Sequence, residues 1–219
     1  GGDFESQAND TPPAKPWNPG PNSNVRISDK SQSPFRNTFP DGVLGIHMPN
    51  RAEYDGFVLT LPTAWNSETT ETLFCCFDFC CGDSPDGSEG SWRYYVGNGP
   101  GNSAAIELFF NGNKFFRRSG DSSETVCPLS LGEWYQVRVT LDLKSRTFTA
   151  SISSDSSRTE FGGEFASGWS GVIDYSFIDS YGHIGGVRPA LDVDNYDISE
   201  SERPTLDASS LAAVTAGFA

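Results

Sequence analysis

Aromatic and amide side chains gather in one short stretch of this sequence. Trp92 and Tyr94 precede a turn rich in glycine and asparagine, which contains Asn98. An aromatic ring can stack on the apolar face of a sugar, and an amide can hydrogen-bond to sugar hydroxyls. The stretch predicts a glycan-binding site at Trp92, Tyr94 and Asn98. Burial of the rings in the core is the alternative, because large aromatic residues stabilise cores. Further aromatic candidates are Trp17, Trp65, Trp169, Tyr175 and Tyr181.

Four of the five cysteines lie in one short run, and Cys127 stands apart from them. Side chains alternate along a strand, so Cys75 and Cys81 would share one face, and Cys76 and Cys80 the other. A strand would separate Cys76 from Cys80 by about 13 Å, beyond the roughly 7 Å between Cα atoms that a disulfide allows. The run predicts mostly reduced, buried thiols, with Cys127 as the one possible disulfide partner. A zinc or iron–sulfur site is the alternative.

Short strands separated by polar turns must position these residues. Apolar and polar residues alternate from Trp134 to Leu143 and again over 147–152, after a turn at Lys144-Ser145. This is the pattern of a β-hairpin with one buried and one exposed face. Residues 71–79 are apolar on both faces, which predicts a central strand that is covered on both sides. Other predicted strands are Phe57–Leu61, Ile106–Phe110, Val25–Ser28, Val43–Met48, Ser91–Val96, Asp174–Ile178 and Leu191–Ile198. This spacing favours a β-sandwich or a barrel.

The length of the chain bounds its domain organisation, and its net charge restricts the classes of binding partner. The chain has 219 residues, and all-β sandwiches of about 200–250 residues commonly form one domain. We interpret 1–205 as a single domain and 206–219 as a tail that is a short helix or disordered. The formal net charge of -14 disfavours binding to nucleic acid and anionic membranes. No apolar run approaches the roughly 20 residues that span a bilayer.

Three segments resemble known families. Residues 132–142 (GEWYQVRVTLD) with 148–152 (FTASI) are similar to a hairpin of laminin-G-like and concanavalin A-like domains. The start of the chain, GDFES at 2–6, resembles the opening strand of calcium-binding jelly-roll carbohydrate-binding modules. VDNYDI at 193–198 resembles their closing strand. The resemblance implies an all-β fold, a two-sheet antiparallel β-sandwich of the concanavalin A-like jelly-roll type.

The resemblance also implies a structural calcium ion. In those modules an opening Glu and a closing Asp hold the ion together with backbone carbonyls. The matching positions here are Glu5 and Asp194, with a carbonyl contribution near Asp3. Calcium takes six to eight oxygen ligands, which carboxylates and carbonyls supply. The alternative is that both acids are solvated residues at strand ends.

Catalytic patterns of jelly-roll enzymes are incomplete in this chain. The glucanase-type Glu-x-Asp-x-x-Glu strand has its nearest counterpart at 53–55 (EYD), which lacks the third acid. Alginate-lyase-like jelly rolls use a Gln-Ile-His strand, whereas 45–47 reads Gly-Ile-His. No nucleophile elbow, Walker loop or dinucleotide motif occurs. We therefore name no catalytic residue, and interpret His47 and His183 as isolated histidines, with catalysis by His47 as the alternative.

Together these features predict a monomeric, non-catalytic glycan-binding module of a secreted, periplasmic or cell-surface protein, with one structural calcium. The unpaired cysteines argue mildly against an oxidising compartment. One alternative is a divergent polysaccharide lyase or glycoside hydrolase. A second is an adhesion or protein-interaction domain. The partner expected from the sequence is a polysaccharide or glycan, without nucleic-acid binding or membrane insertion.

Overall fold

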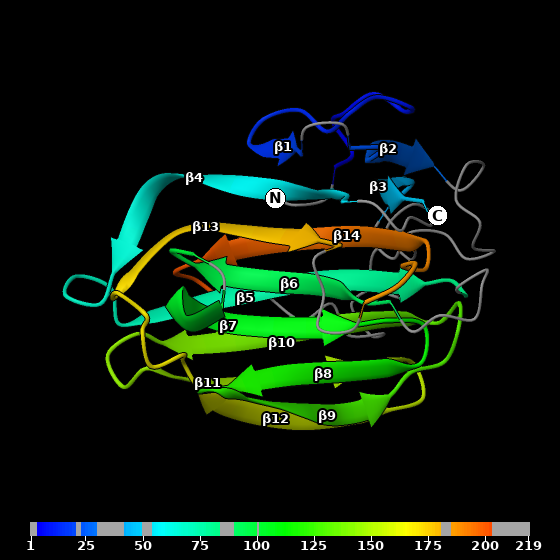
Figure 1. Ribbon diagram of the computed structural model, residues 1–219. Helices are drawn as coiled ribbons and strands as arrows, with labels where there is room; N and C mark the ends of the chain where they lie inside the picture. Colours follow the sequence, from blue (N-terminus) through cyan, green and yellow to red (C-terminus); the bar gives the residue numbers. More distant parts are fainter. Residues whose placement is uncertain are drawn as a thin grey trace, which may run out of the picture.

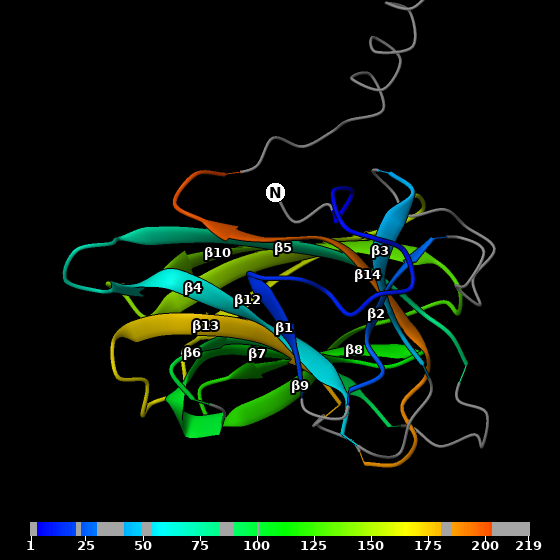
Figure 2. The ribbon, with the colours of Figure 1, turned by 90° about the horizontal axis from the view of Figure 1, so that it is seen from above.

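Two antiparallel β-sheets pack face to face in this protein (Figures 1 and 2). The structure is a computed structural model, which describes residues 4–20, 23–29, 42–49, 54–83, 90–99, 101–180 and 185–202. Asp3 and the predicted tail 206–219 lie outside the described residues. Within these ranges no helix is long and apolar enough to cross a membrane.

The first sheet faces the viewer in Figure 1. In spatial order it contains β1 (Trp17–Pro19), β4 (Gly56–Asn66), β13 (Val172–Asp179), β6 (Trp92–Gly97), β7 (Ala104–Phe110), β8 (Lys114–Ser119) and β9 (Ser122–Pro128). A 3₁₀ turn, η1 (Gly101–Ser103), precedes β7. We call this sheet the front sheet.

The second sheet lies behind it and is called the back sheet. In spatial order it contains β12 (Arg158–Glu164), β11 (Thr147–Ser153), β10 (Trp134–Asp142), β5 (Thr72–Cys81), β14 (Leu191–Ser199), β3 (Leu44–Met48) and β2 (Arg26–Asp29). The predicted central strand is confirmed, since β5 lies between β10 and β14. The predicted hairpin is confirmed as well, because β10 pairs with β11 over its length.

The core fills the space between the inner faces of the sheets. Phe77 of β5 stacks on Tyr94 of β6, with ring centroids 4.4 Å apart, and also packs near Phe110 of β7. Along β10 every second residue from Tyr135 to Leu141 is buried, as the alternation predicts. The other side chains of β10 face away from the core. The polar face of the hairpin is therefore an outer face of the molecule.

The two chain ends are arranged differently from the sequence expectation. Glu5 lies in a turn rather than in an opening strand. The last strand, β14, has β3 and β5 as neighbours, whereas the first strand, β1, pairs with β4 in the other sheet. The N-terminal segment reaches the back sheet through Glu5 Oε1, which accepts hydrogen bonds of 2.8 Å from the N–H groups of Val43 and Leu44. A side chain therefore makes the link that strand pairing was expected to make.

Candidate functional site

A groove crosses the outer face of the back sheet. Its floor is one row of residues that pair across five neighbouring strands, from β14 to β12. Asp197 is opposite Cys76, and Cys76 is opposite Arg138. Arg138 is opposite Ser151, and Ser151 is opposite Glu160. The groove therefore assembles segments that are far apart in the sequence.

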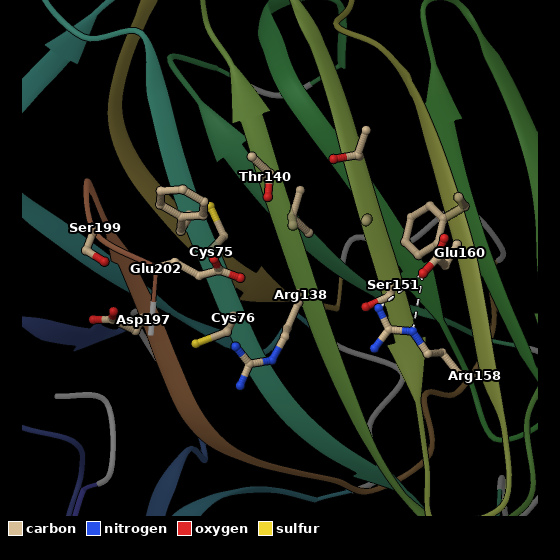
Figure 3. A pocket seen from close by; sticks show the side chains of 15 residues that line it. Cys75, Cys76, Arg138, Thr140, Ser151, Arg158, Glu160, Asp197, Ser199 and Glu202 are labelled. Atoms are coloured by element: carbon tan, nitrogen blue, oxygen red, sulfur yellow. Dashed lines mark hydrogen bonds and ion pairs between the residues drawn. The ribbon is translucent and has the colours of Figure 1, made fainter. Parts of the chain in front are cut away.

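Polar and apolar side chains together line this groove (Figure 3). The cavity has a volume of about 360 Å³. Asp197, Ser199 and Glu202 lie on one side, and Glu160 lies on the other, with Arg138 between them. The remaining lining residues are Phe74, Cys75, Cys76, Val139, Thr140, Thr149, Ala150, Ser151, Arg158 and Phe161. Hydroxyl, guanidinium and carboxylate groups together can both donate and accept hydrogen bonds.

Neighbouring side chains orient the charged groups of the groove. Arg138 Nε donates a hydrogen bond of 2.8 Å to Gln136 Oε1, which lies two residues earlier on the same face of β10. At the outer end, Arg158 Nη2 lies 3.2 Å from Glu160 Oε1, and both side chains are largely exposed. An exposed pair of this kind adds little stability. Arg158 and Glu160 can therefore exchange their mutual contact for one with a ligand.

The predicted stacking residues Trp92 and Tyr94 do not lie at the surface. Both side chains are 0% exposed in the core, and Trp92 Nε1 donates a hydrogen bond of 2.8 Å to the carbonyl of Pro189. Their rings offer no face to a sugar, so the structure contradicts this part of the predicted site. The reason is strand alternation, because Arg93 and Tyr95 take the outward positions of β6 instead.

Asn98, the third predicted residue, is exposed at the end of β6. Its Nδ2 donates a hydrogen bond of 2.8 Å to Asp174 Oδ2. Asp174 belongs to β13, next to the partly buried Tyr175. Asn98 therefore contacts the strand that carries Tyr175, and it does not form a site with the buried Trp92 and Tyr94.

The outer face of the front sheet also carries a buried ion network that the sequence did not reveal. Arg93 Nη2 lies 2.8 Å from Asp179, and Arg93 Nη1 lies 3.2 Å from Glu107. Arg118 Nη1 contacts the other oxygen of Glu107 at 3.0 Å. Burial lowers the pKa of Arg93, but its hydrogen bonds and charge interactions with Asp179 and Glu107 outweigh burial, so the net pKa is raised. The network keeps the charge of Arg93 in a buried position.

Glu5 and Asp194, the predicted calcium ligands, approach the same part of the back sheet. Glu5 binds the start of β3. Val193 pairs with Ile46 of β3, so Asp194 is the next residue along β14 towards that end. Asp194 is buried, and its Oδ1 accepts a hydrogen bond of 2.7 Å from the N–H of Asn195. No cluster of three or more acidic, histidine or cysteine side chains suited to a metal occurs among the described residues.

His47 differs from the isolated residue that we expected. Its Nδ1 lies 2.7 Å from Asp192 Oδ1 across the β3–β14 pair. The His47 side chain is 17% exposed and Asp192 is buried. Asp192 therefore fixes the orientation of the imidazole. His183 lies outside the described residues.

The cysteine run adopts the alternating arrangement that its sequence predicts. Cys75 and Cys81 pack in the main core, and Cys80 packs with Ala190 and Trp134 on the other face of β5. None of the five cysteines forms a disulfide bond, and Cys127 is only partly buried. Burial raises the pKa of Cys75, Cys80 and Cys81, which keeps these thiols protonated and unreactive.

Comparisons with known proteins establish the fold. The sequence matches no protein-family model and no curated protein. Similar solved structures include a sialidase, with a TM-score of 0.54, 15% identity, and coverage of 82% of this chain and 17% of that chain. They also include a GH131 beta-glucanase catalytic domain from Podospora anserina, with a TM-score of 0.53, 13% identity, and coverage of 83% and 80%.

Lectin I from Ulex europaeus, in complex with the methyl glycoside of α-L-fucose, is a third similar structure. Its TM-score is 0.54 at 13% identity, with coverage of 87% of this chain and 94% of that chain. The chain has the concanavalin A-like jelly-roll fold. Sequence identity this low establishes architecture alone, because one fold supports many functions. The chain spans 17% of the sialidase, so the activity of that whole protein does not transfer to this concanavalin A-like domain.

Proposed function

We propose that this chain is a non-catalytic glycan-binding module of a secreted or cell-surface protein and that it works as a monomer. The groove on the back sheet is the observation that supports this function. Its volume of about 360 Å³ and its hydroxyl, guanidinium and carboxylate lining suit a ligand rich in hydroxyl groups. The lectin fold of the similar structures is compatible with this ligand class.

The dimensions of the groove favour an oligosaccharide over a single sugar. The first and the fifth of these strands are separated by four interstrand distances of about 4.8 Å each. The Cα atoms of Asp197 and Glu160 are therefore about 19 Å apart across the sheet. That span exceeds one sugar ring. We expect several consecutive sugar units to lie across the strands, with Arg138 and Ser151 at the middle of the ligand.

The wide spacing of Asp197 and Glu160, on opposite sides of the groove, supports binding rather than hydrolysis by this pair. A glycosidase needs two carboxyl groups about 5–9.5 Å apart on either side of the scissile bond. Asp197 and Glu160 belong to strands four spacings apart, so they cannot act together on one bond. The expected result with a panel of soluble oligosaccharides is binding without any new reducing end.

The test replaces the central guanidinium of the groove. We expect Arg138→Ala to weaken the binding of any oligosaccharide retained on a glycan array by about ten-fold or more, since hydrogen bonds to charged groups contribute about 1.5–3 kcal/mol. Arg118→Ala, on the outer face of β8 in the other sheet, is the matched control and should bind normally. Unchanged affinity in Arg138→Ala, with binding otherwise detected, would exclude the groove as the site.

We further propose the structural calcium near Glu5 and Asp194. Two carboxylates that come from distant segments and approach one end of β3 are the kind of donors that calcium prefers. Asp78, directly opposite Asp194, adds another buried carboxylate to this region. When bound, the ion would neutralise these acids and join the N-terminal segment to β14. Asp3, the other predicted ligand, lies outside the described residues.

A further inference from the structure

Three aromatic rings form a cluster on the outer face of the front sheet. Tyr175 and Phe177 of β13 are stacked, with ring centroids 5.9 Å apart and an interplanar angle of 17°. Tyr95 of the neighbouring strand β6 stacks on Phe177 at 4.6 Å. Tyr95 is fully buried, whereas Tyr175 and Phe177 are partly exposed. Tyr95 therefore supports the two rings that reach the surface, which we call the aromatic shelf.

Small residues flank the outer ring of the shelf. Tyr175 pairs with Gly97 on β6 and with Thr60 on β4. Gly97 has a φ of 154°, and a Cβ there would lie 2.9 Å from the backbone nitrogen of Ala105, so a side chain at this position is excluded. Neither Gly97 nor Thr60 places a large side chain beside Tyr175, whose ring contacts Tyr95 at a centroid distance of 5.6 Å and is partly exposed. β4, β13 and β6 lie next to one another in Figure 1.

A carboxylate and an amide lie at the end of the shelf. Asp174 immediately precedes Tyr175, at the point where the pairing of β13 with β4 is irregular. Asn98 Nδ2 donates a hydrogen bond to Asp174 Oδ2. The other oxygen, Asp174 Oδ1, is buried and receives no hydrogen bond from any described residue. A buried carboxylate oxygen without a donor is costly, so this oxygen favours a ligand hydroxyl as its donor.

We propose that the aromatic shelf is a second binding site, which takes one neutral pyranose ring. The apolar face of the sugar stacks on Tyr175 beside Phe177, whose own ring is contacted by Tyr95 and by the Arg93 guanidinium. One sugar hydroxyl donates to Asp174 after a small rotation of the exposed Asn98 side chain. The carboxylate of Asp174 and the formal net charge of -14 disfavour acidic sugars. The site lies on the opposite sheet from the groove, so it does not depend on the function proposed above.

Nuclear magnetic resonance of the aromatic rings tests this proposal. The probes are the methyl glycosides of β-D-glucose, β-D-galactose, α-D-mannose, α-L-fucose and N-acetyl-β-D-glucosamine, with methyl sialoside as the acidic comparison. We expect at least one neutral glycoside to shift the Tyr175 and Phe177 signals saturably, and the sialoside to leave them unchanged. Tyr175→Ala should weaken the affinity about three- to ten-fold, as expected for the loss of one ring contact.

Three further variants separate the possible outcomes. Asp174→Asn removes the charge while retaining the shape and should also weaken binding, so it gives a result even if Tyr175→Ala fails to fold. Tyr54→Ala changes a tyrosine that is 50% exposed elsewhere on the chain and should have no effect. Arg138→Ala alters only the groove and should leave the shelf signals unchanged. The proposal is wrong if no neutral glycoside shifts the shelf signals, or if the response survives both shelf variants.

Discussion

Cys127 differs from the other cysteines in its exposure. It lies on β9 at the edge of the front sheet and is partly buried, whereas the four cysteines of β5 are buried. Burial raises the pKa of the thiols of Cys75, Cys80 and Cys81 on β5. A thiol reacts as the thiolate, so burial and a raised pKa together protect Cys75, Cys80 and Cys81, while Cys76 is protected by its burial.

We therefore expect a thiol reagent to modify at most Cys127 in the folded protein at pH 7. All five cysteines should react after denaturation, because none forms a disulfide bond. Mass spectrometry of the labelled protein gives the count under each condition. Cys127→Ser should abolish the reaction in the folded state, and rapid native labelling of β5 would contradict the burial of these residues.

Asp142 controls the turn of the β10–β11 hairpin. Its Oδ1 accepts hydrogen bonds from the N–H groups of Lys144 at 3.0 Å and Ser145 at 2.8 Å. The hydrogen bond from the Ser145 backbone is the main reason that the pKa of Asp142 is lowered. A depressed folded-state pKa adds stability above the unfolded pKa of about 4, and this stability is lost as the pH falls through the folded-state value.

Asp142→Asn should accordingly be less stable than the wild type at pH 7, by less than about 1 kcal/mol since the site is largely exposed. Asparagine retains the acceptor oxygen but not the charge. The difference in free energy of unfolding, measured in urea, should shrink below pH 4 and vanish near pH 2. A difference that grows on acidification would contradict the lowered pKa.

At the scale of single elements, β5 holds the sandwich together. It pairs with β10 and β14 on its edges and packs against the front sheet through Phe77 and Phe79. Phe77 contacts aromatic rings from β6, β7 and β14. One face of β5 thus joins the two sheets, while the other face contributes Phe74 and Cys76 to the groove.

Phe77→Ala should lower the free energy of unfolding by about 3–5 kcal/mol, because it removes a fully buried ring between packed aromatics. Phe74→Ala on the outer face of the same strand is the matched control and should cost much less, since Phe74 is only partly buried. Urea unfolding followed by tryptophan fluorescence measures both. Equal losses would mean that the two faces of β5 are assigned wrongly.

At the scale of the whole molecule, the N-terminal segment is joined to the sandwich at several points, including backbone hydrogen bonds of Asp10 and Thr11 with Ile27 of β2. Phe4 packs on Trp17 with ring centroids 4.9 Å apart, and Glu5 binds the start of β3. The calcium ion proposed near Glu5 and Asp194 would strengthen this connection. An ion that binds only the folded state stabilises it by about 2.7 kcal/mol at one hundred times its Kd.

The melting temperature should therefore rise by about 5–10 °C in saturating calcium and fall with a chelator, given about 2–4 °C per kcal/mol for a chain of this size. Glu5→Gln retains an acceptor oxygen for Val43 and Leu44 but loses the charge, so it should reduce the calcium response. Differential scanning calorimetry measures both proteins. A melting temperature that is insensitive to millimolar calcium and to chelator would exclude the ion.

The strands of this protein could be predicted where burial differs between their faces. Alternation of apolar and polar residues predicted β10 and β11, and a run that is apolar on both faces predicted β5. Such predictions are possible because the burial of each strand face determines which of its residues are apolar. The edge strands β9 and β12 were not predicted from the sequence. Their residues are largely exposed or half-buried, and β12 contains Gly162 and Gly163, so no apolar alternation marks them.

The candidate sites depended on the tertiary structure. The sequence determined that 92–95 alternates, but either alternate pair could have faced outward, and only packing against β5 directed Trp92 and Tyr94 into the core. The groove likewise needs Asp197, Arg138 and Glu160 in one row, which is set by pairing across strands that are distant in sequence. Alternation is local and can be recognised in one segment, whereas register and neighbours are decided by the assembled sheets.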